Sequence, residues 1–330
     1  MNISSLRDAN IPIRLDAAGL VALADLATIS KRTALTGSAS ILDILFLAPG
    51  IHTQQEASNV NGGELPTTAA MTTGYVFRIE NQATVHYLQR IGDPGCLVTV
   101  QVVDNNPHSP FRRLLTDLFY TGSIFASILY ATGISLTIFS LLILGINHDF
   151  WAVAVLLMLV AARFLNTIVI KRRTQVGWKG APEPGVKGDL LVLLSQDRWV
   201  RMRGWVDDLK VTTAGQWLRE ETQIEGFASA FATLLVFLAA ALATNASTVG
   251  SIFIAGLLLI NVTMLGLCNS LTKDLRMFGR TVHITGEPKK YKRRLEMAEE
   301  LMKETGRTDW AISMGLVLPP KDTPATKVTI

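Results

Sequence analysis

Four long uncharged stretches dominate the chain, at residues 118–146, 150–170, 226–246 and 249–271. Arg163 is the one Lys, Arg, Asp or Glu within them. A helix needs about 20 apolar residues to cross the roughly 30 Å of hydrocarbon in a bilayer, and only helices and closed barrels satisfy their backbone hydrogen bonds there. The pattern therefore predicts a polytopic α-helical membrane protein whose four transmembrane helices form two hairpins.

The segments outside these stretches have ordinary globular composition, although the whole chain is 49% hydrophobic. We therefore expect a small cytoplasmic α+β domain beside the helices. The expected division is a cytoplasmic N-terminal region with short strands at 1–115, transmembrane hairpin 1 at 116–171, a cytoplasmic β-rich segment at 172–225, transmembrane hairpin 2 at 226–271, and a cytoplasmic basic helix with a disordered tail at 272–330.

Basic residues flank the four stretches on one side only. The turns on the other side, residues 147–149 and 245–248, contain no Lys or Arg, and cytoplasmic loops carry an excess of these residues. The asymmetry predicts an integral, multi-pass protein with both termini in the cytoplasm, in a membrane that the sequence does not identify. The flanking residues are Arg112, Arg113, Lys171, Arg172, Arg173, Arg219, Lys273, Arg276 and Arg280.

Local patterns predict the elements of the cytoplasmic part. β-forming residues predict three short strands between 75 and 103 and two more at 190–194 and 198–205. Helical periodicity is present at 16–30 and 288–305, whereas 54–73 is typical of a polar loop. Residues 38–48 form an apolar run that is too short to span a bilayer, so we expect a buried or membrane-surface element there.

Arg163 has two interpretations. It lies seven residues before Ile170, about 10 Å at 1.5 Å per residue, so its side chain could snorkel to the cytoplasmic headgroups; we favour this interpretation. The alternative is an internal role with Asn166 or Asn261. No Asp or Glu lies within the four stretches, which argues against a proton-coupled transporter.

Hydroxyl and small residues distinguish the other helices. The first stretch is rich in Ser and Thr, whose hydroxyls in membrane helices usually bond to their own backbone or to a neighbouring helix. A polar path or a site for a lipid-like substrate is the alternative. The third and fourth stretches are rich in Ala and Gly, which favours close helix packing and predicts a homo-oligomer.

The strand expected at 198–205 places Trp199, Arg201 and Arg203 on one face, because side chains alternate along a strand. Guanidinium groups pair with phosphate oxygens and stack on indole rings. This face is therefore a candidate for contact with lipid headgroups or phosphate. The alternative is a solvated face or an internal salt bridge to Asp207 or Asp208.

A basic run stands at the start of the expected helix at 288–305. Its members are Lys289, Lys290, Lys292, Arg293 and Arg294. Basic residues near a cytoplasmic membrane surface are attracted by its anionic lipids, so the run predicts contact with the inner leaflet. A solvated helix start is the alternative, although cations at a helix N-terminus oppose the helix dipole.

Familiar catalytic and cofactor motifs are absent from the sequence. The histidines and the two cysteines lack the spacing of a metal site or a disulfide framework, and there is no P-loop, GxGxxG, HExxH or GxSxG pattern. The sequence therefore predicts no metal and no cofactor, and it assigns no catalytic residue. The net charge of +4 is too small to indicate a nucleic-acid partner.

One part of the chain has a resemblance. The stretch GDLLVLLSQDRWVRMRGWVDDLK at 188–210, followed by TAGQWLRE at 213–220, resembles a segment of uncharacterised integral membrane proteins of filamentous fungi. The resemblance implies a fungal host and a membrane location. It carries over no catalytic or binding residue.

Three functions are compatible with these patterns. We favour a scaffolding or regulatory role at the cytoplasmic face of a membrane, in which the cytoplasmic domain and the basic run contact the anionic inner leaflet or a partner. The alternative is a membrane-embedded enzyme or accessory factor that acts on a lipophilic metabolite. Its pocket would be formed by the hydroxyl-rich first helix, and the residues at its cytoplasmic mouth would be Arg163, Trp199, Arg201, Arg203 and Asp207. The third is a small oligomeric channel lined by the first helix.

Overall fold

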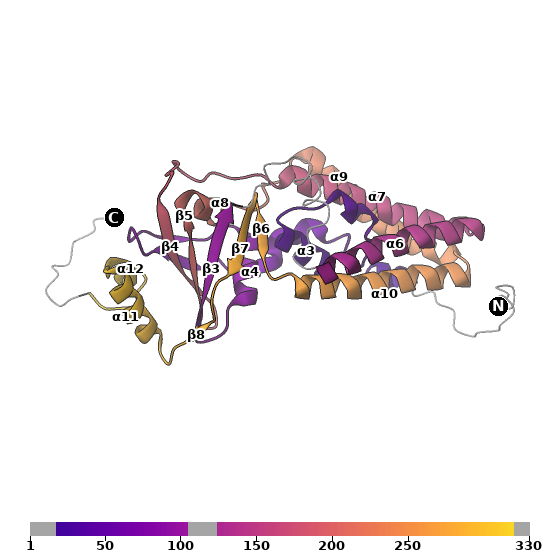
Figure 1. Ribbon diagram of the computed structural model, residues 1–330. Coiled ribbons are helices and arrows are strands. Elements are labelled where there is room, and N and C mark those ends of the chain that lie inside the picture. The colour runs from indigo at the N-terminus through magenta and orange to yellow at the C-terminus, as the bar shows by residue number, and fades with distance from the viewer. Residues whose placement is uncertain (1–17, 105–123, 320–330) are drawn as a thin grey trace.

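The computed structural model describes residues 18–104 and 124–319. Figure 1 shows a bundle of long helices with a sheet domain at one end. The long helices are α6 (Ile124–Ile146), α7 (Phe150–Arg173), α9 (Gln223–Leu242), which is extended by the 3-10 helix η3 (Ala243–Asn245), and α10 (Thr248–Leu271). These four helices of the described chain are long and apolar enough to cross a membrane, as predicted. Residues 118–123 of the first stretch lie outside the described residues.

Short turns join α6 to α7 and η3 to α10, but each long helix packs mainly against a helix of the other pair. α7 lies along α9, and α6 lies along α10. The Asp149 carboxylate connects the two turns, because it accepts hydrogen bonds from the Ala152 N–H at 3.2 Å and the Ser247 hydroxyl at 2.6 Å. We term this end of the bundle the turn end, and the end that adjoins the sheet domain the sheet end.

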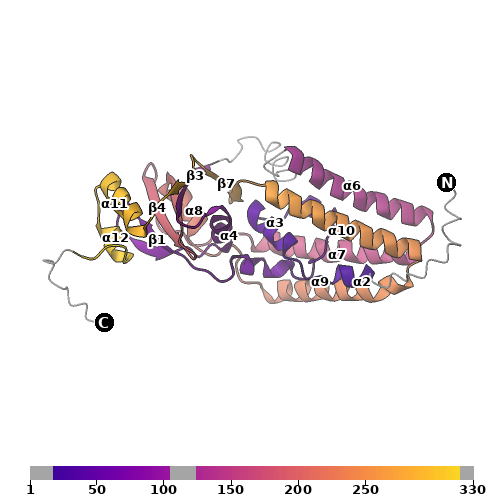
Figure 2. The same ribbon diagram turned by 90° about the horizontal axis from the view of Figure 1, so that it is seen from below.

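The first described residues fill the bundle between the long helices (Figure 2). α2 (Ala18–Ala22) contacts α9, α10 and η3 at the turn end, and α3 (Thr28–Thr36) contacts α10 and the sheet domain at the sheet end. The chain then re-enters the bundle through η1 (Ile41–Leu45), which packs on α7 and α6. Phe46 and Leu47 are at most 1% exposed. The end of the run at 38–48 is therefore buried, although Ile41 near its start is 55% exposed. The helical pattern at 16–30 is divided between two helices.

Gly133 of α6 allows the close approach of this segment. A Cβ at Gly133 would lie 2.3 Å from the ring of Phe46, which also stacks on Tyr130 with centroids 5.2 Å apart. We expect Gly133→Ala to lower the free energy of unfolding by about 1–3 kcal/mol, because Phe46 must move. Thermal unfolding of the purified protein measures this loss. Gly145→Ala on the same helix is the control, since nothing lies within 4 Å of its added methyl; equal losses would contradict the packing.

The sheet domain contains an eight-stranded mixed sheet within the described residues. The strand order is β2-β1-β4-β5-β3-β7-β6, and β8 pairs with the first residues of β3. β3 and β5 run parallel, and the other pairs are antiparallel. The strands are β1 (Thr67–Ala70), β2 (Val76–Arg78), β3 (Cys96–Asp104), β4 (Lys187–Leu194), β5 (Arg198–Trp205), β6 (Leu275–Met277), β7 (Arg280–Ile284) and β8 (Lys289–Lys290). They come from the chain before, between and after the two helix pairs.

Helices cover both faces of the sheet. One face packs with α4 (Gln82–Ile91) and α8 (Val206–Thr213), and the other packs with α11 (Arg294–Thr305) and α12 (Asp309–Ser313). Val200 and Met202 belong to the first of these cores, while Trp199 belongs to the second. The alternation predicted for β5 is therefore confirmed.

The strand predicted within 83–91 is wrong, because this stretch forms α4. The Asn81 side chain caps the helix by accepting a hydrogen bond from the Thr84 N–H at 3.0 Å. Thr84 and Leu88 are both fully buried and stand one helical turn apart. The valine, tyrosine and isoleucine of the stretch favour strands, but the Asn81 cap and the burial of one helical face stabilise the helix.

Two further predictions for the sheet domain are wrong. The helix expected at 288–305 begins only at Arg294, because Lys289 and Lys290 pair with β3. The polar loop expected at 54–73 contains the 3-10 helix η2 (Gln54–Asn61) and β1. The strands β6 and β7 were not predicted, since each has five residues or fewer.

α3 joins the bundle to the sheet domain. Leu35 of α3 and Ile170 of α7 both belong to the sheet core. Trp217, which is fully buried, donates its Nε1–H to the carbonyl of Gly37 at 2.8 Å. Gly37 has a φ of 72°, and a Cβ there would lie 2.2 Å from the Arg276 carbonyl oxygen. The junction therefore requires glycine at this position.

His86 of α4 links the stability of the sheet domain to pH. Burial, followed by the charge of Lys31, lowers the pKa of His86 from 6.5 to about 4. Between these values the unfolded chain binds a proton that the folded chain does not bind, so stability declines as the pH falls from 6.5 toward 4. We expect His86→Gln to lose less stability than the wild type on acidification from about pH 7 to about pH 5. Denaturant unfolding at both pH values measures this, and identical losses would contradict it.

Candidate functional site

Arg163 lies inside the bundle and is 1% exposed. Its Nε donates a hydrogen bond to the carbonyl of Asp43 at 3.0 Å, and its Nη1 donates to the side chain of Gln54. The favoured prediction that this side chain snorkels to the headgroups is wrong, because η1 and η2 bring acceptors to the guanidinium group. The internal alternative holds, but the partners come from the N-terminal part of the chain.

Asp43 brings a buried carboxylate to the same place. It is 6% exposed and accepts hydrogen bonds from the Ser40 N–H at 2.7 Å and the Tyr130 hydroxyl at 2.5 Å. The Arg32 guanidinium group lies 5.8 Å from the centre of the Tyr130 ring. Sequence analysis missed Asp43, although an acidic residue inside the apolar run at 38–48 was an available signal.

Asn166 and Asn261 also bind the re-entering chain. The Nδ2 of Asn166 donates to the carbonyl of Ile51 at 2.7 Å, and the Nδ2 of Asn261 donates to the carbonyl of Leu47 at 2.8 Å. Buried carbonyls outside regular structure need such donors. The three predicted intramembrane residues, Arg163, Asn166 and Asn261, therefore hold one segment, residues 41–55, which we term the re-entrant segment.

The hydroxyls of α6 mostly bond to their own helix. Thr132 donates to the carbonyl of Ile128 at 2.8 Å, and Ser135 donates to the carbonyl of Ala131 at 2.9 Å. Both residues are exposed on the outside of the bundle. The backbone-bonding interpretation is confirmed for these two, and neither lines a polar path. The more N-terminal hydroxyls at 121 and 123 lie outside the described residues.

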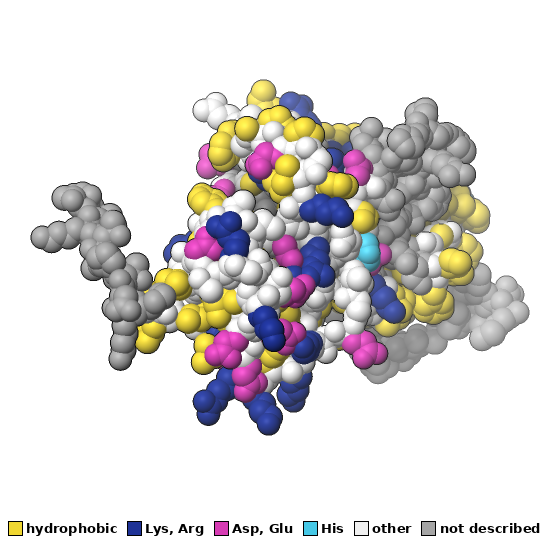
Figure 3. All heavy atoms as spheres, turned by 60° about the vertical axis from the view of Figure 1, so that its left-hand side comes forward, with side chains coloured by type: hydrophobic (Ala, Val, Ile, Leu, Met, Phe, Trp, Pro, Cys, Tyr) yellow, Lys and Arg dark blue, Asp and Glu magenta, His cyan; other side chains and the backbone are white. Residues whose placement is uncertain are grey.

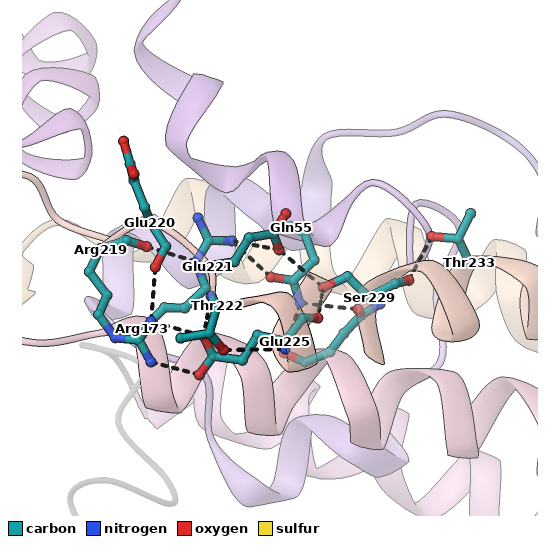
Figure 4. Close-up of polar contacts among 10 residues, drawn as sticks. Gln55, Arg173, Arg219, Glu220, Glu221, Thr222, Glu225, Ser229 and Thr233 are labelled. Carbon is teal, nitrogen blue, oxygen red and sulfur yellow. Dashed lines mark hydrogen bonds and ion pairs between the residues drawn. The ribbon is translucent and has the colours of Figure 1, made fainter. Parts of the chain in front are cut away.

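A charged network joins α7 and α9 at the sheet end (Figure 4). Arg173 donates from Nε to the carbonyl of Arg219 at 3.0 Å and from Nη1 to the side chain of Gln55 at 3.2 Å. Arg219 pairs with Glu225 at 2.6 Å, and Glu225 is 3% exposed. These four residues, which we term the sheet-end clamp, tie the re-entrant segment to both helices.

The arginines of β5 are paired with carboxylates of the sheet domain. Arg201, which is 6% exposed, contacts Asp189 of β4 at 2.5 Å and Glu304 of α11 at 2.7 Å. Arg203 contacts the same carboxylates at 3.3 and 2.7 Å. The hydrogen bond from Arg201 holds the pKa of Glu304 below its usual value. An internal salt bridge is therefore present, but with partners other than the two predicted aspartates.

A groove of about 750 Å³ lies beside these arginines. Its lining includes Gln101, Lys187 and Trp205, and the Lys187 ammonium group lies 5.8 Å from the centre of the Trp205 ring. β3 and β7 lie between β5 and β6, the strand that follows α10. At about 4.8 Å per strand, β5 is about 14 Å from β6.

The face of β5 that was predicted to contact headgroups points away from the bundle. Trp199 on this face lies in the core under α11, whereas Val200 and Met202 on the other face share a core with Ile170 of α7.

The basic run lies at an edge of the sheet domain. Lys289 pairs with Glu300 at 2.5 Å, and Arg294 pairs with Asp197 in the turn between β4 and β5. Figure 3 shows Lys and Arg side chains gathered with acidic side chains at the lower edge of this domain. The basic run therefore lies beside the first residues of β3 and β5. Its contact with a lipid surface stays a prediction.

Metal ligands do not gather within the described residues, since no group of three or more His, Cys, Asp or Glu side chains is placed to hold an ion. Comparison of the chain with known protein families, curated proteins and solved structures found no match. The structure itself therefore defines the class: a bundle of four helices of membrane-spanning length joined to a mixed sheet domain. Buried polar side chains hold the re-entrant segment inside this bundle.

Proposed function

We propose that this chain is an integral, multi-pass membrane protein with a scaffolding or regulatory role at the cytoplasmic face of a membrane. In this proposal the sheet end faces the cytoplasm, because Lys171, Arg172 and Lys273 lie there. The turn end, with Asn147, His148 and Asp149, has no Lys or Arg within the described residues. The predicted cytoplasmic N-terminus lies outside the described residues, and α2, the first described helix, contacts η3 at the turn end.

The hydrogen bonds of the buried polar side chains support this proposal. Arg163, Asn166 and Asn261 bind the chain's own carbonyls and amides, and the sheet-end clamp connects the same segment to α7 and α9. A transport pathway needs polar groups that can meet the transported species. Groups that bind the chain itself instead support an anchor that holds the sheet domain in one orientation.

A second copy of the chain and anionic lipids are the proposed partners within the membrane. Gly256 and Gly266 of α10 have no atom within 4 Å of an added Cβ, whereas Ala232 and Ala239 of α9 are buried inside the bundle. Small residues allow helices to approach closely in lipid. α10 is therefore the helix that supports a homo-oligomer.

The native mass of the detergent-purified protein tests the proposed role. A discrete oligomer that retains ordinary phospholipid is the expected result. A monomer that retains one specific small lipophile would instead favour the membrane-embedded enzyme. Gly256→Ile combined with Gly266→Ile should convert the oligomer to a monomer, and the same change at Gly145, which is on α6 and equally open, should not.

A further inference from the structure

A cavity lies where the bundle meets the sheet domain, and the scaffolding role does not use it. Its volume is about 370 Å³. Its lining comes from η2 and the turn after it, the first residue of α4, the last residue of α7, and the chain that leads into α9. We term it the junction cavity. A ligand bound there would contact the bundle and the sheet domain together.

Several polar side chains of the lining have hydrogen-bonding groups that the protein does not use. The side chains of Ser58, Asn59 and Gln216 form no hydrogen bond with another described residue. Gln82 accepts from the Trp217 N–H through its Oε1 at 3.1 Å, but its Nε2 has no acceptor within the described chain. Hydroxyl and amide side chains both donate and accept hydrogen bonds. The lining therefore suits a ligand that also does both.

Arg173 adds a buried donor to this lining. Its side chain is 10% exposed, and its Nε and Nη1 donate to the Arg219 carbonyl and the Gln55 side chain (Figure 4). Its second terminal nitrogen, Nη2, has no hydrogen-bond acceptor among the described residues. Buried donors in folded proteins are nearly always bonded. An acceptor bound in the junction cavity would complete the hydrogen bonds of this guanidinium group.

The charges around the junction cavity favour an uncharged ligand. Among the described residues that line it, Arg173 is the one cation and Glu220 is the one carboxylate. Glu221 lies 3.9 Å from Arg173, so an anion would meet two carboxylates and a cation would meet the guanidinium group. Leu65 and Leu218 add apolar surface to the lining. Hydroxyl groups on a C–H framework have the chemistry that this lining complements.

We propose that the junction cavity binds an uncharged polyol, such as the ring of a hexose. Its volume lies within the range of about 300–1,000 Å³ that is usual for small-molecule sites. The polyol is either a soluble sugar or the headgroup of a glycolipid, because Arg173 ends α7 and Glu220 precedes α9, at the end of the bundle where the proposed function places the membrane surface. Only the glycolipid source rests on that function.

Two sets of probes separate these sources. The full chain in phosphatidylcholine nanodiscs is titrated with glucose, galactose and myo-inositol, and saturation-transfer NMR reports binding. In parallel, native mass spectrometry measures retention of galactosyl diacylglycerol from nanodiscs that contain it. Saturable binding of a free sugar assigns a soluble ligand, and retention of the glycolipid without binding of any free sugar assigns a headgroup. A monomeric native mass would contradict the scaffolding role but would not change either binding result.

Matched variants test the residues. Asn59→Ala combined with Gln216→Ala is expected to weaken binding by about tenfold or more, because two amide side chains are lost. The unfolding temperature without ligand should not change, since both side chains are exposed. Gln175→Ala, which removes an exposed amide outside the cavity, should bind like the wild type.

Four results would overturn the proposal. The first is the absence of saturable binding for every probe. The second and third are equal binding by the double variant and the wild type, and an equal loss in Gln175→Ala. The fourth is tighter binding of glucose 6-phosphate than of glucose, because it would contradict the preference for an uncharged ligand.

Discussion

Replacing Arg163 with methionine is expected to lower the free energy of unfolding by about 3 kcal/mol. Methionine has a similar length, but it cannot donate to the Asp43 carbonyl or to Gln54, so both acceptors remain buried without this donor. The Asp43 carboxylate also loses the compensating charge inside the bundle. Denaturant unfolding of the purified protein, followed by tryptophan fluorescence, measures the loss.

Two comparisons make this result specific. Lys171→Met, at an exposed position near the end of the same helix, should change stability by less than about 0.5 kcal/mol. Asp43→Asn in the Arg163→Met background should restore part of the stability, because no unpaired carboxylate then remains. A double variant that is less stable than Arg163→Met, or an Arg163→Met protein as stable as the wild type, would contradict the buried arrangement.

Arg201→Met is expected to destabilise the sheet domain by about 3 kcal/mol. Its side chain is 7% exposed and contacts two carboxylates from different elements, so its loss leaves Asp189 and Glu304 facing each other with one cation fewer. Because Glu304 belongs to α11, this helix should be released from the sheet first. Limited proteolysis between α11 and β8, combined with denaturant unfolding, measures both effects.

Arg203→Met is the matched control for Arg201→Met. Arg203 contacts the same two carboxylates, but its side chain is 40% exposed. Water screens an exposed ion pair, so we expect a loss below about 1 kcal/mol. Equal losses in the two variants would show that burial does not set the strength of these pairs.

Elements with a strong compositional or periodic signal could be predicted from the sequence. The four long helices follow from uncharged stretches of sufficient length, and β4 and β5 follow from β-forming residues on either side of a short turn. α4 was missed because its β-branched and aromatic residues favour a strand; the Asn81 cap is a local signal of a helix start that the sequence offered, whereas the buried face depends on the fold. The same applies to β8, whose lysines become a strand only by pairing with β3.

The candidate site could also be predicted only in part. Arg163, Asn166 and Asn261 were recognisable as polar residues that require partners inside an apolar helix. Their partners were not recognisable, since Asp43 is 120 positions from Arg163 in the chain and the pairing depends on how the re-entrant segment folds back. Glu304 is likewise 103 positions from Arg201. Sequence patterns thus identify polar side chains that require hydrogen-bond or ion-pair partners, and only the fold shows which groups are those partners.

Photocrosslinking from position 46 tests most directly whether the re-entrant segment lies inside the bundle. Phe46 is 1% exposed, and its ring lies against Gly133 and Tyr130 of α6. A photoreactive phenylalanine introduced there in nanodisc-embedded protein should crosslink to a peptide from within Ile124–Ile146. Crosslinks to lipid, or labelling by water, would contradict the account, because they would place the segment at the surface of the bundle.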